Sequence, residues 1–132
     1  MTVLFTDTPR ISHVVKNEFW PEQGFCRLEV TVNEASAKTY KAGTVLGKVT
    51  ASGKYKIAVE TAVDGSKVGA AIVLGDYSIA ATTDTKVIVL VKGPAIVSKG
   101  ALDIDASYDN ATKLGVLYAD LEAKNINVDA TV

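Results

Sequence analysis

The sequence predicts a mainly β protein, a compact antiparallel β-barrel with one short C-terminal helix and an extended N-terminal arm. Three observations support this fold class. Short apolar runs recur along the chain, turn-forming residues such as Asp64-Gly65-Ser66 separate them, and no helical pattern lies between them. Because parallel strands need long crossover connections, usually helices, antiparallel pairing is the natural arrangement.

The first two predicted strands alternate between apolar and polar residues. In residues 25–32 the even positions from Cys26 to Val32 are all apolar, and residues 54–60 alternate in a similar way. Successive side chains of a strand point to opposite faces of its sheet. Each of these strands is therefore expected to bury one face and to expose the other.

Two later runs, residues 68–74 (VGAAIVL) and 86–92 (KVIVLVK), are apolar on both faces. Strands that are buried on two sides have this composition. A closed barrel can bury both faces within one chain, and contact between copies of the chain can bury one of them. A further strand is expected over residues 95–98, after the turn signal Gly93-Pro94.

Residues 109–126 break the β pattern and predict an amphipathic helix that covers one end of the barrel. Its apolar side chains recur at helical spacing: Leu114, Leu117, Tyr118 and Leu121. Asp109 or Asn110 can cap its start. Gly115 costs about 1 kcal/mol relative to alanine inside a helix, so we expect this glycine to pack closely against the β body.

The bulk composition limits the possible partners. A chain of 132 residues has the size of one domain, and its net charge of −1 leaves no electrostatic footprint for a nucleic acid. No apolar run approaches the roughly 20 residues that span a bilayer, and the first residues lack the pattern of a secretory signal. The single cysteine, Cys26, excludes an intramolecular disulfide. We expect neither a nucleic acid nor a membrane as partner.

Residues 41–56 contain three glycines, two of them followed by lysine, which are the residue types of a phosphate-binding loop. Such a loop needs four residues between its glycines, then Lys followed by Ser or Thr, and it must open a helix. Here three residues separate Gly43 from Gly47, five separate Gly47 from Gly53, and a turn and a strand follow. These glycines are expected to shape turns and bends.

No other stretch predicts a catalytic, cofactor or metal site. His13 and Cys26 are the only histidine and cysteine; they cannot supply a zinc site by themselves, and Cys26 falls on an apolar strand face typical of a buried thiol. Residues 103–114 open like a calcium loop. However, Tyr108 replaces the required glycine and Leu114 the required glutamate.

The N-terminal segment, residues 1–24, is unusual, and we predict that it is an arm preceding a β-rich domain of residues 25–132. All phenylalanines and the one tryptophan lie within the first 25 residues, where no regular period is sustained. Large apolar groups on an irregular arm are typical of docking to another protein, because aromatic anchors dominate interface energetics. The alternative is that Trp20 plugs the end of its own β body.

Three stretches together resemble the head decoration protein family of lambda-like tailed bacteriophages. They are AGTVLGKVTASGKY (42–55), DGSKVGAAIVLGD (64–76) and TKVIVLVKGPAIVSKGALDI (85–104), in this order. Each stretch alone is a weak signal, and their combination is fairly specific. The resemblance covers roughly residues 28–126, and the first twenty residues show no alignable match.

This resemblance implies a compact β-rich, tulip-like domain without a cofactor that assembles as a homotrimer. Such trimers sit on the outer surface of the expanded capsid, at its local three-fold positions, and reinforce the shell against packaged DNA. The arm of each subunit orders by pairing with a strand of the major capsid protein. The residues of this arm expected to contact the capsid are Leu4, Phe5, Ile11, Val14, Val15, Phe19 and Trp20.

A second function class fits the same composition. A β-barrel binding module for carbohydrate or for a host surface, displayed on a virion or cell, needs exposed aromatic side chains on its body. The body tyrosines that could form such a platform are Tyr40, Tyr55, Tyr77 and Tyr108. An enzyme is the third and weakest hypothesis.

Overall fold

The structure, a computed structural model, describes residues 14–18 and 26–130. The elements, in chain order, are β1 (Val15–Glu18), β2 (Arg27–Val32), β3 (Lys38–Tyr40), β4 (Val45–Lys48), β5 (Tyr55–Ile57), β6 (Gly69–Val73), β7 (Tyr77–Ile79), β8 (Thr85–Leu90), β9 (Ala95–Ser98), the 3₁₀ helix η2 (Lys99–Ala101), α2 (Ala111–Glu122) and β10 (Ile126–Asp129). The mainly β fold with one α-helix in the described part of the chain confirms the predicted fold class.

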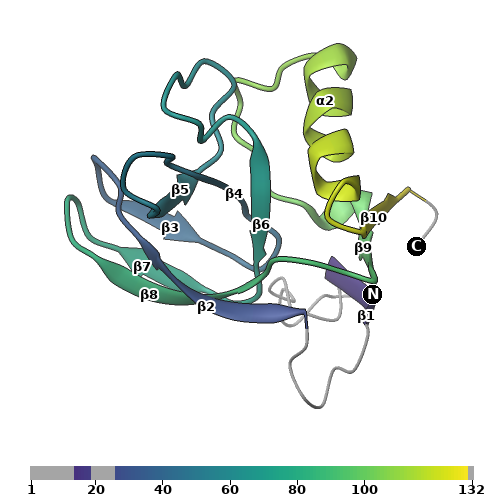
Figure 1. Cartoon of the computed structure of the whole chain (residues 1–132), viewed down its shortest axis with the longest axis horizontal. Helices are drawn as coiled ribbons and strands as arrows, with labels where there is room; N and C mark the ends of the chain where they lie inside the picture. Colours follow the sequence, from purple (N-terminus) through teal and green to yellow (C-terminus); the bar gives the residue numbers. More distant parts are fainter. Residues whose placement is uncertain (1–13, 19–25, 131–132) are drawn as a thin grey trace, which may run out of the picture.

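Five strands close into a barrel in the order β2-β5-β4-β6-β8 (Figure 1). All neighbours in it are antiparallel except β2 and β5. The two-stranded ribbon β3–β7 adds Tyr40 and Ile79 to the core cluster that contains the inward side chains of the barrel. The other buried members of this inner cluster are Val30, Val32, Leu46, Ala71, Val73, Val87 and Val89.

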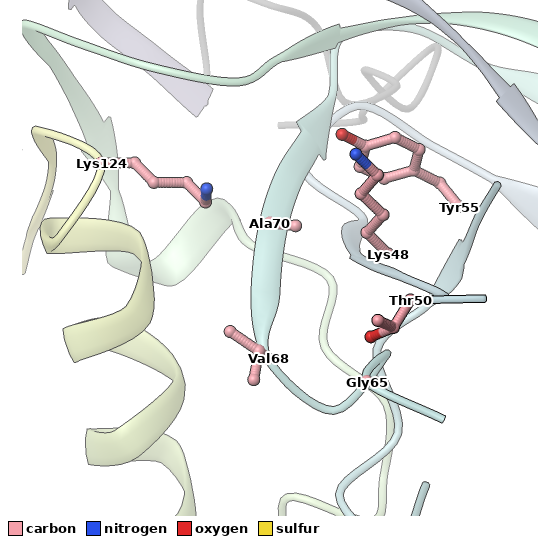
Figure 2. A pocket seen from close by; sticks show the side chains of 7 residues that line it. All are labelled: Lys48, Thr50, Tyr55, Gly65, Val68, Ala70 and Lys124. Carbon is pink, nitrogen blue, oxygen red and sulfur yellow. The ribbon is translucent and has the colours of Figure 1, made fainter. Parts of the chain in front are cut away.

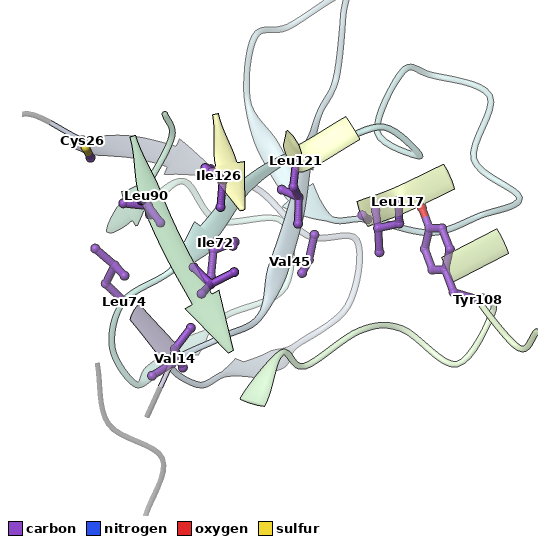
Figure 3. Packing of buried hydrophobic residues seen from close by; sticks show 14 residues of the cluster. Val14, Cys26, Val45, Ile72, Leu74, Leu90, Tyr108, Leu117, Leu121 and Ile126 are labelled. Atoms are coloured by element: carbon purple, nitrogen blue, oxygen red, sulfur yellow. The ribbon is translucent and has the colours of Figure 1, made fainter. Parts of the chain in front are cut away.

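A second core lies between the barrel, α2 and the three-stranded sheet β1-β9-β10, which sits at one end of the molecule (Figure 1). Strand β6 separates the two cores, because Ala71 and Val73 face the inner cluster while Ile72 and Leu74 face the outer one (Figure 3). The predicted two-sided burial is confirmed for residues 71–74, whereas Val68 at the start of the predicted run is 47% exposed. One chain achieves it without a second copy.

Strand β8 only partly follows this prediction. Val87 and Val89 are buried in the inner cluster and Leu90 in the outer cluster. Ile88, however, is 37% exposed. The outer core covers only the C-terminal end of β8, where β6 pairs with it at Val89 and Leu90.

Strand β2 also departs from the simple alternation. Val30 and Val32 are buried as expected, but Leu28 is 52% exposed. The reason is the length of its neighbour: β5 has three residues and meets β2 only at the pair Val32↔Tyr55. No strand of the described chain covers that side of β2 beside Leu28.

Helix α2 begins where the sequence predicted but ends earlier. The Asn110 side chain caps it by accepting a hydrogen bond from the Lys113 N–H at 3.0 Å. The expectation for Gly115 was wrong, because a Cβ there would meet no atom within 4 Å. The close approach comes from strand β6 instead, where a Cβ on Gly69 would lie 2.9 Å from Leu117 Cδ1.

No helix in the described ranges is long and apolar enough to cross a membrane.

The glycines of the suspected phosphate loop have structural roles, as predicted. Gly43 and Gly53 have φ angles of 103° and 72°, which L-residues with a side chain rarely adopt. Gly47 lies in β4, where a Cβ would come within 1.8 Å of the Ser66 carbonyl oxygen. The glycines therefore shape the turns and permit a close approach between backbone segments.

Candidate functional site

Strand β1 forms one edge of the sheet β1-β9-β10. It runs antiparallel to β9 with the pairs Val15↔Val97, Asn17↔Ile96 and Glu18↔Ala95. On its other side, the described part of the chain supplies no partner strand. An open strand edge offers backbone N–H and C=O groups to a strand from another protein.

A bulge interrupts this edge. The register shifts between Val15 and Asn17, so that Lys16 is the extra residue, and its side chain is exposed. Bulges bend a strand and increase its local twist. Lys16 is therefore the point at which the regular pairing of β1 with β9 is interrupted.

The strand on which β1 rests is held firmly. β9 pairs with β10 along its whole length, from Ala95↔Ile126 to Ser98↔Asp129. Just before β9, the Gly93 N–H donates to the Lys124 carbonyl oxygen at 2.8 Å. These contacts make β9 a preorganised support for β1.

The structure shows where two of the seven predicted arm residues lie. Val14 is fully buried in the outer core, and Val15 is partly buried against the same cluster. The remaining five lie outside the described residues: Leu4, Phe5, Ile11, Phe19 and Trp20. Val14 and Val15 thus belong to a segment of the predicted arm that is packed into the domain, and capsid contact by any of the seven residues stays a prediction.

Two grooves meet on the barrel surface at Lys48 and Tyr55, which line both. One, with a volume of about 520 Å³, also touches Thr50, Gly65, Val68, Ala70 and Lys124 (Figure 2). The other, of about 430 Å³, runs along β2 past Leu28 and Thr31. The Lys48 Nζ lies 6.0 Å from the centre of the Tyr55 ring. Sequence patterns did not indicate these grooves, because their walls come from strands that are distant in the chain.

Glu34 is a buried charged residue that the sequence did not single out. It is 2% exposed, and its Oε2 accepts hydrogen bonds from the Tyr40 hydroxyl and, at 2.7 Å, from the Ile57 N–H. Burial, and then the contact with Glu34, raise the pKa of Tyr40. These partners tie the segment before β3 to β5, which is a structural role.

The other residues considered for chemistry in the sequence are Cys26 and His13. Cys26 is buried with its Sγ 3.7 Å from the Pro94 carbonyl oxygen, and His13 lies outside the described residues. Among the described residues, no group of three or more His, Cys, Asp or Glu side chains is arranged to hold a metal ion.

The platform of four tyrosines needed by a carbohydrate-binding module is not formed. Tyr40 is fully buried and Tyr108 is 7% exposed. The Tyr108 hydroxyl donates to the Lys67 carbonyl oxygen at 2.6 Å inside the fold. Half of the proposed aromatic surface is therefore used for packing.

Comparison with known proteins decides the family. The family model described as "Bacteriophage lambda head decoration protein D" matches residues 5–126. The chain belongs to this family. No curated protein sequence matches it significantly. Membership in the head decoration family implies association with a phage capsid and a place on the virion.

The family match confirms the resemblance seen in the sequence and extends it toward the N-terminus. It begins at Phe5, inside the predicted arm, and ends at Ile126, the first residue of β10. It therefore includes β1 and its supporting strand β9. The match to the family model thus includes both the barrel and the edge strand β1.

Proposed function

We propose that this protein is a capsid-reinforcing decoration protein that binds as a homotrimer to the outside of the expanded phage head. The observation that carries the proposal is the family match over residues 5–126. The edge of β1 that has no partner strand among the described residues supports it, because β1 follows the N-terminal segment directly in the chain. The major capsid protein is the partner, and no cofactor or catalytic step is involved.

The arm attaches by strand addition in this proposal. A strand of the capsid protein pairs with the chain N-terminal to β1, and backbone hydrogen bonds supply much of the affinity. Phe5, Phe19 and Trp20 fill pockets on the capsid. Val14 in the outer core holds the base of the arm against the domain.

The reinforcement is mechanical. Packaged DNA presses outward on a thin shell, and a trimer that bridges several capsid subunits adds binding free energy that a ruptured shell would lose. Three arms on one trimer bind with a high effective concentration, so that modest individual contacts give tight attachment. The affinity for the capsid therefore depends on the trimer as well as on the contacts of each single chain.

The apolar composition of β6 does not locate the trimer contact. Both faces of β6 are covered within one chain, so its apolar composition no longer argues for self-association. The trimer is proposed from the family membership.

The test is to mix the purified protein with expanded, undecorated capsids and to measure co-sedimentation. Static light scattering of the free and bound protein reports its mass. We expect saturable binding to expanded capsids and a mass three times that of the 13.9 kDa chain. Absence of binding to expanded capsids contradicts the decoration role, and a monomer mass both in solution and on capsids contradicts the trimer.

A further inference from the structure

Five large apolar side chains are exposed in the described part of the chain, and three of them lie on one side of the molecule. The five are Leu28, Val63, Val68, Ile88 and Val116. Val63 and Val68 belong to the loop between β5 and β6, whereas Val116 lies on α2. Figure 1 shows this loop and the first turns of α2 at the top of the view, and β2 and β8, which carry the other two side chains, at the bottom. We call Val63, Val68 and Val116 the valine face.

Contacts made by neighbouring residues bring Val68 and Val116 to the same junction. The Gly69 N–H donates to Asp120 Oδ2 at 3.3 Å, and a Cβ on Gly69 would lie 2.9 Å from Leu117 Cδ1. Val68, the residue before Gly69, therefore lies beside α2. Val116 stands four positions before Asp120, so the two residues share one flank of the helix. Val68 and Val116 thus lie on either side of the junction between β6 and α2.

The β5–β6 loop, which carries Val63, is held in place at both ends. The Asp64 carbonyl oxygen accepts from the Thr50 N–H at 3.0 Å. Earlier in the loop, the Glu60 N–H donates to the Ser107 hydroxyl oxygen at 2.9 Å. Val63, between these two anchors, is nonetheless fully exposed. Because the loop is already ordered, a partner that buries Val63 loses little conformational entropy on binding.

The groove of about 520 Å³ described above lies beside the valine face. Figure 2 shows Val68 and Ala70 on β6, which form its apolar floor together with the Tyr55 ring. Lys124 lies on the side of α2, and Lys48 lies on the opposite side with Tyr55. Among the described residues that line the groove, none is acidic. The groove therefore favours an apolar segment that carries carboxylates.

We propose that the valine face is the subunit contact of the homotrimer, with the β5–β6 loop of one copy bound in this groove of the next. The inference rests on the proposed homotrimer, in which other copies must cover part of the surface of each chain. The loop has the chemistry that the groove favours. Val63 is apolar, and the side chains of Glu60 and Asp64 in the same loop are 30% and 36% exposed.

This contact agrees with both the symmetry and the capsid role of the proposed trimer. The loop and the groove are different surfaces, so the contact is heterologous, and a heterologous contact that closes forms a ring. The valines form its apolar centre, and the lysines and carboxylates form its polar rim, as in other protein interfaces. The edge of β1 stays free for the capsid, because β1 lies at the bottom of the view in Figure 1, away from the β5–β6 loop.

The first test is light scattering of single lysine variants of the full chain. Val63→Lys, Val68→Lys and Val116→Lys should each lower the mass from three chains toward one chain of 13.9 kDa, at a concentration at which the unsubstituted protein is trimeric. Each adds a charge to the apolar centre and a like charge beside the lysines of the groove. Leu28→Lys and Ile88→Lys are the matched controls, because they make the same change at exposed apolar residues outside the valine face. The controls should keep the trimer mass, and thermal melts check that every variant is folded.

The second test is disulfide cross-linking, which identifies the two surfaces that touch. One chain carries Val63→Cys and another carries Ala70→Cys, both with Cys26→Ala, so that each chain has a single thiol. After mixing and oxidation with copper phenanthroline, the two chains should form a covalent dimer on a non-reducing gel. Val63→Cys mixed with Leu28→Cys is the control and should not form one.

The outcomes separate this contact from the decoration role. Loss of the trimer in the two control variants but not in the valine variants overturns the contact, and so does a covalent dimer formed by Val63→Cys alone, because the loop would then touch its own counterpart. If the unsubstituted chain is a monomer in solution, the same mixture is cross-linked on expanded capsids, and absence of the covalent dimer there overturns the contact. Co-sedimentation with expanded capsids decides the decoration role separately, whichever surface the copies share.

Discussion

At the scale of single residues, Glu34 shows how the fold accommodates a buried carboxylate. Its Oε2 accepts from both the Tyr40 hydroxyl and the Ile57 N–H. A buried polar group is tolerated when it is hydrogen-bonded and is costly when a partner is removed. The pair therefore holds the chain before β3 against β5.

Replacement of Tyr40 by phenylalanine should lower the free energy of unfolding by about 1–3 kcal/mol, because Glu34 loses a donor inside the fold. Urea denaturation followed by circular dichroism measures this change. Tyr118→Phe is the control, since the Tyr118 ring lies on α2 under the Lys99 ammonium group at 4.8 Å, and we expect a much smaller effect. Equal stability of Tyr40→Phe and the unsubstituted protein would show that the Glu34 contact contributes nothing.

Asp64 organises the loop before β6. Its Oδ1 accepts from the Ser66 hydroxyl at 2.6 Å and the Ser66 N–H at 3.1 Å, and its Oδ2 lies 2.9 Å from Lys56 Nζ. The Ser66 hydrogen bond, followed by the contact with Lys56, lowers the pKa of Asp64 below its usual 3.8. A lowered pKa means that folding favours the ionised carboxylate.

The pH dependence follows from this direction. The Asp64 contribution is fully present above the unfolded-state pKa of about 4 and is lost as the pH falls below that value toward the folded-state pKa. Asp64→Asn should therefore lose less stability between pH 5 and pH 2 than the unsubstituted protein. Thermal melts across this range measure the slopes. Identical slopes for the two proteins would show that Asp64 has no linked proton.

At the scale of elements, two glycines show how opposite demands arise in strand and helix. Gly47 in β4 faces the Ser66 carbonyl oxygen, and a Cβ would lie 1.8 Å from it. Gly115 in α2 has open space where its Cβ would be. Strand β4 needs a residue without a side chain at this position, because the Ser66 backbone lies so close. Helix α2 gains nothing from having a glycine at position 115.

Gly115→Ala should stabilise the protein by up to about 1 kcal/mol, the difference in helix propensity between the two residues. Gly47→Ala should destabilise it by several times that amount, because backbone atoms must move to admit the methyl group. Chemical denaturation of both variants under one set of conditions tests the contrast. Stabilisation by Gly47→Ala, or a marked loss of stability with Gly115→Ala, would contradict the packing described for these elements.

At the scale of the whole molecule, β1 links the folded domain to the proposed capsid contact. The strand lies within residues 1–24, which the sequence assigned to the arm, yet it pairs with β9 and follows the buried Val14. Its removal therefore affects stability as well as binding. To measure the effect on capsid binding without the effect on stability, a truncation must stop before Val14.

Deletion of residues 1–13 should change the unfolding free energy little and should abolish or greatly weaken capsid binding. Deletion of residues 1–18 should also cost about 2 kcal/mol or more, because it removes the fully buried Val14 and an edge strand. Thermal melts, light scattering and capsid co-sedimentation of both truncations measure stability, mass and binding. Full-strength binding by the shorter protein would place the capsid contact on the barrel.

The sequence by itself determined the features that depend on neighbouring residues and on family patterns. Turn chemistry and apolar runs predicted a mainly β barrel, and helical spacing predicted α2. Of the two residues predicted as possible caps, Asp109 and Asn110, the structure has Asn110 as the cap. The three quoted stretches indicated the head decoration family, which the match over residues 5–126 confirmed. Such signals are local, because strand alternation and capping act over a few residues.

Only the tertiary structure decided which of these residues meet. The exposure of Leu28 depends on the length of β5, and the burial of Val14 depends on the pairing of β1 with β9. Glu34 is satisfied by Ile57, 23 positions along the chain. These outcomes follow from contacts between distant segments, so residue type and local spacing do not predict them. The two-sided burial of β6 was visible in the sequence, but only the second core showed that this same chain, and no neighbouring copy, covers its outer face.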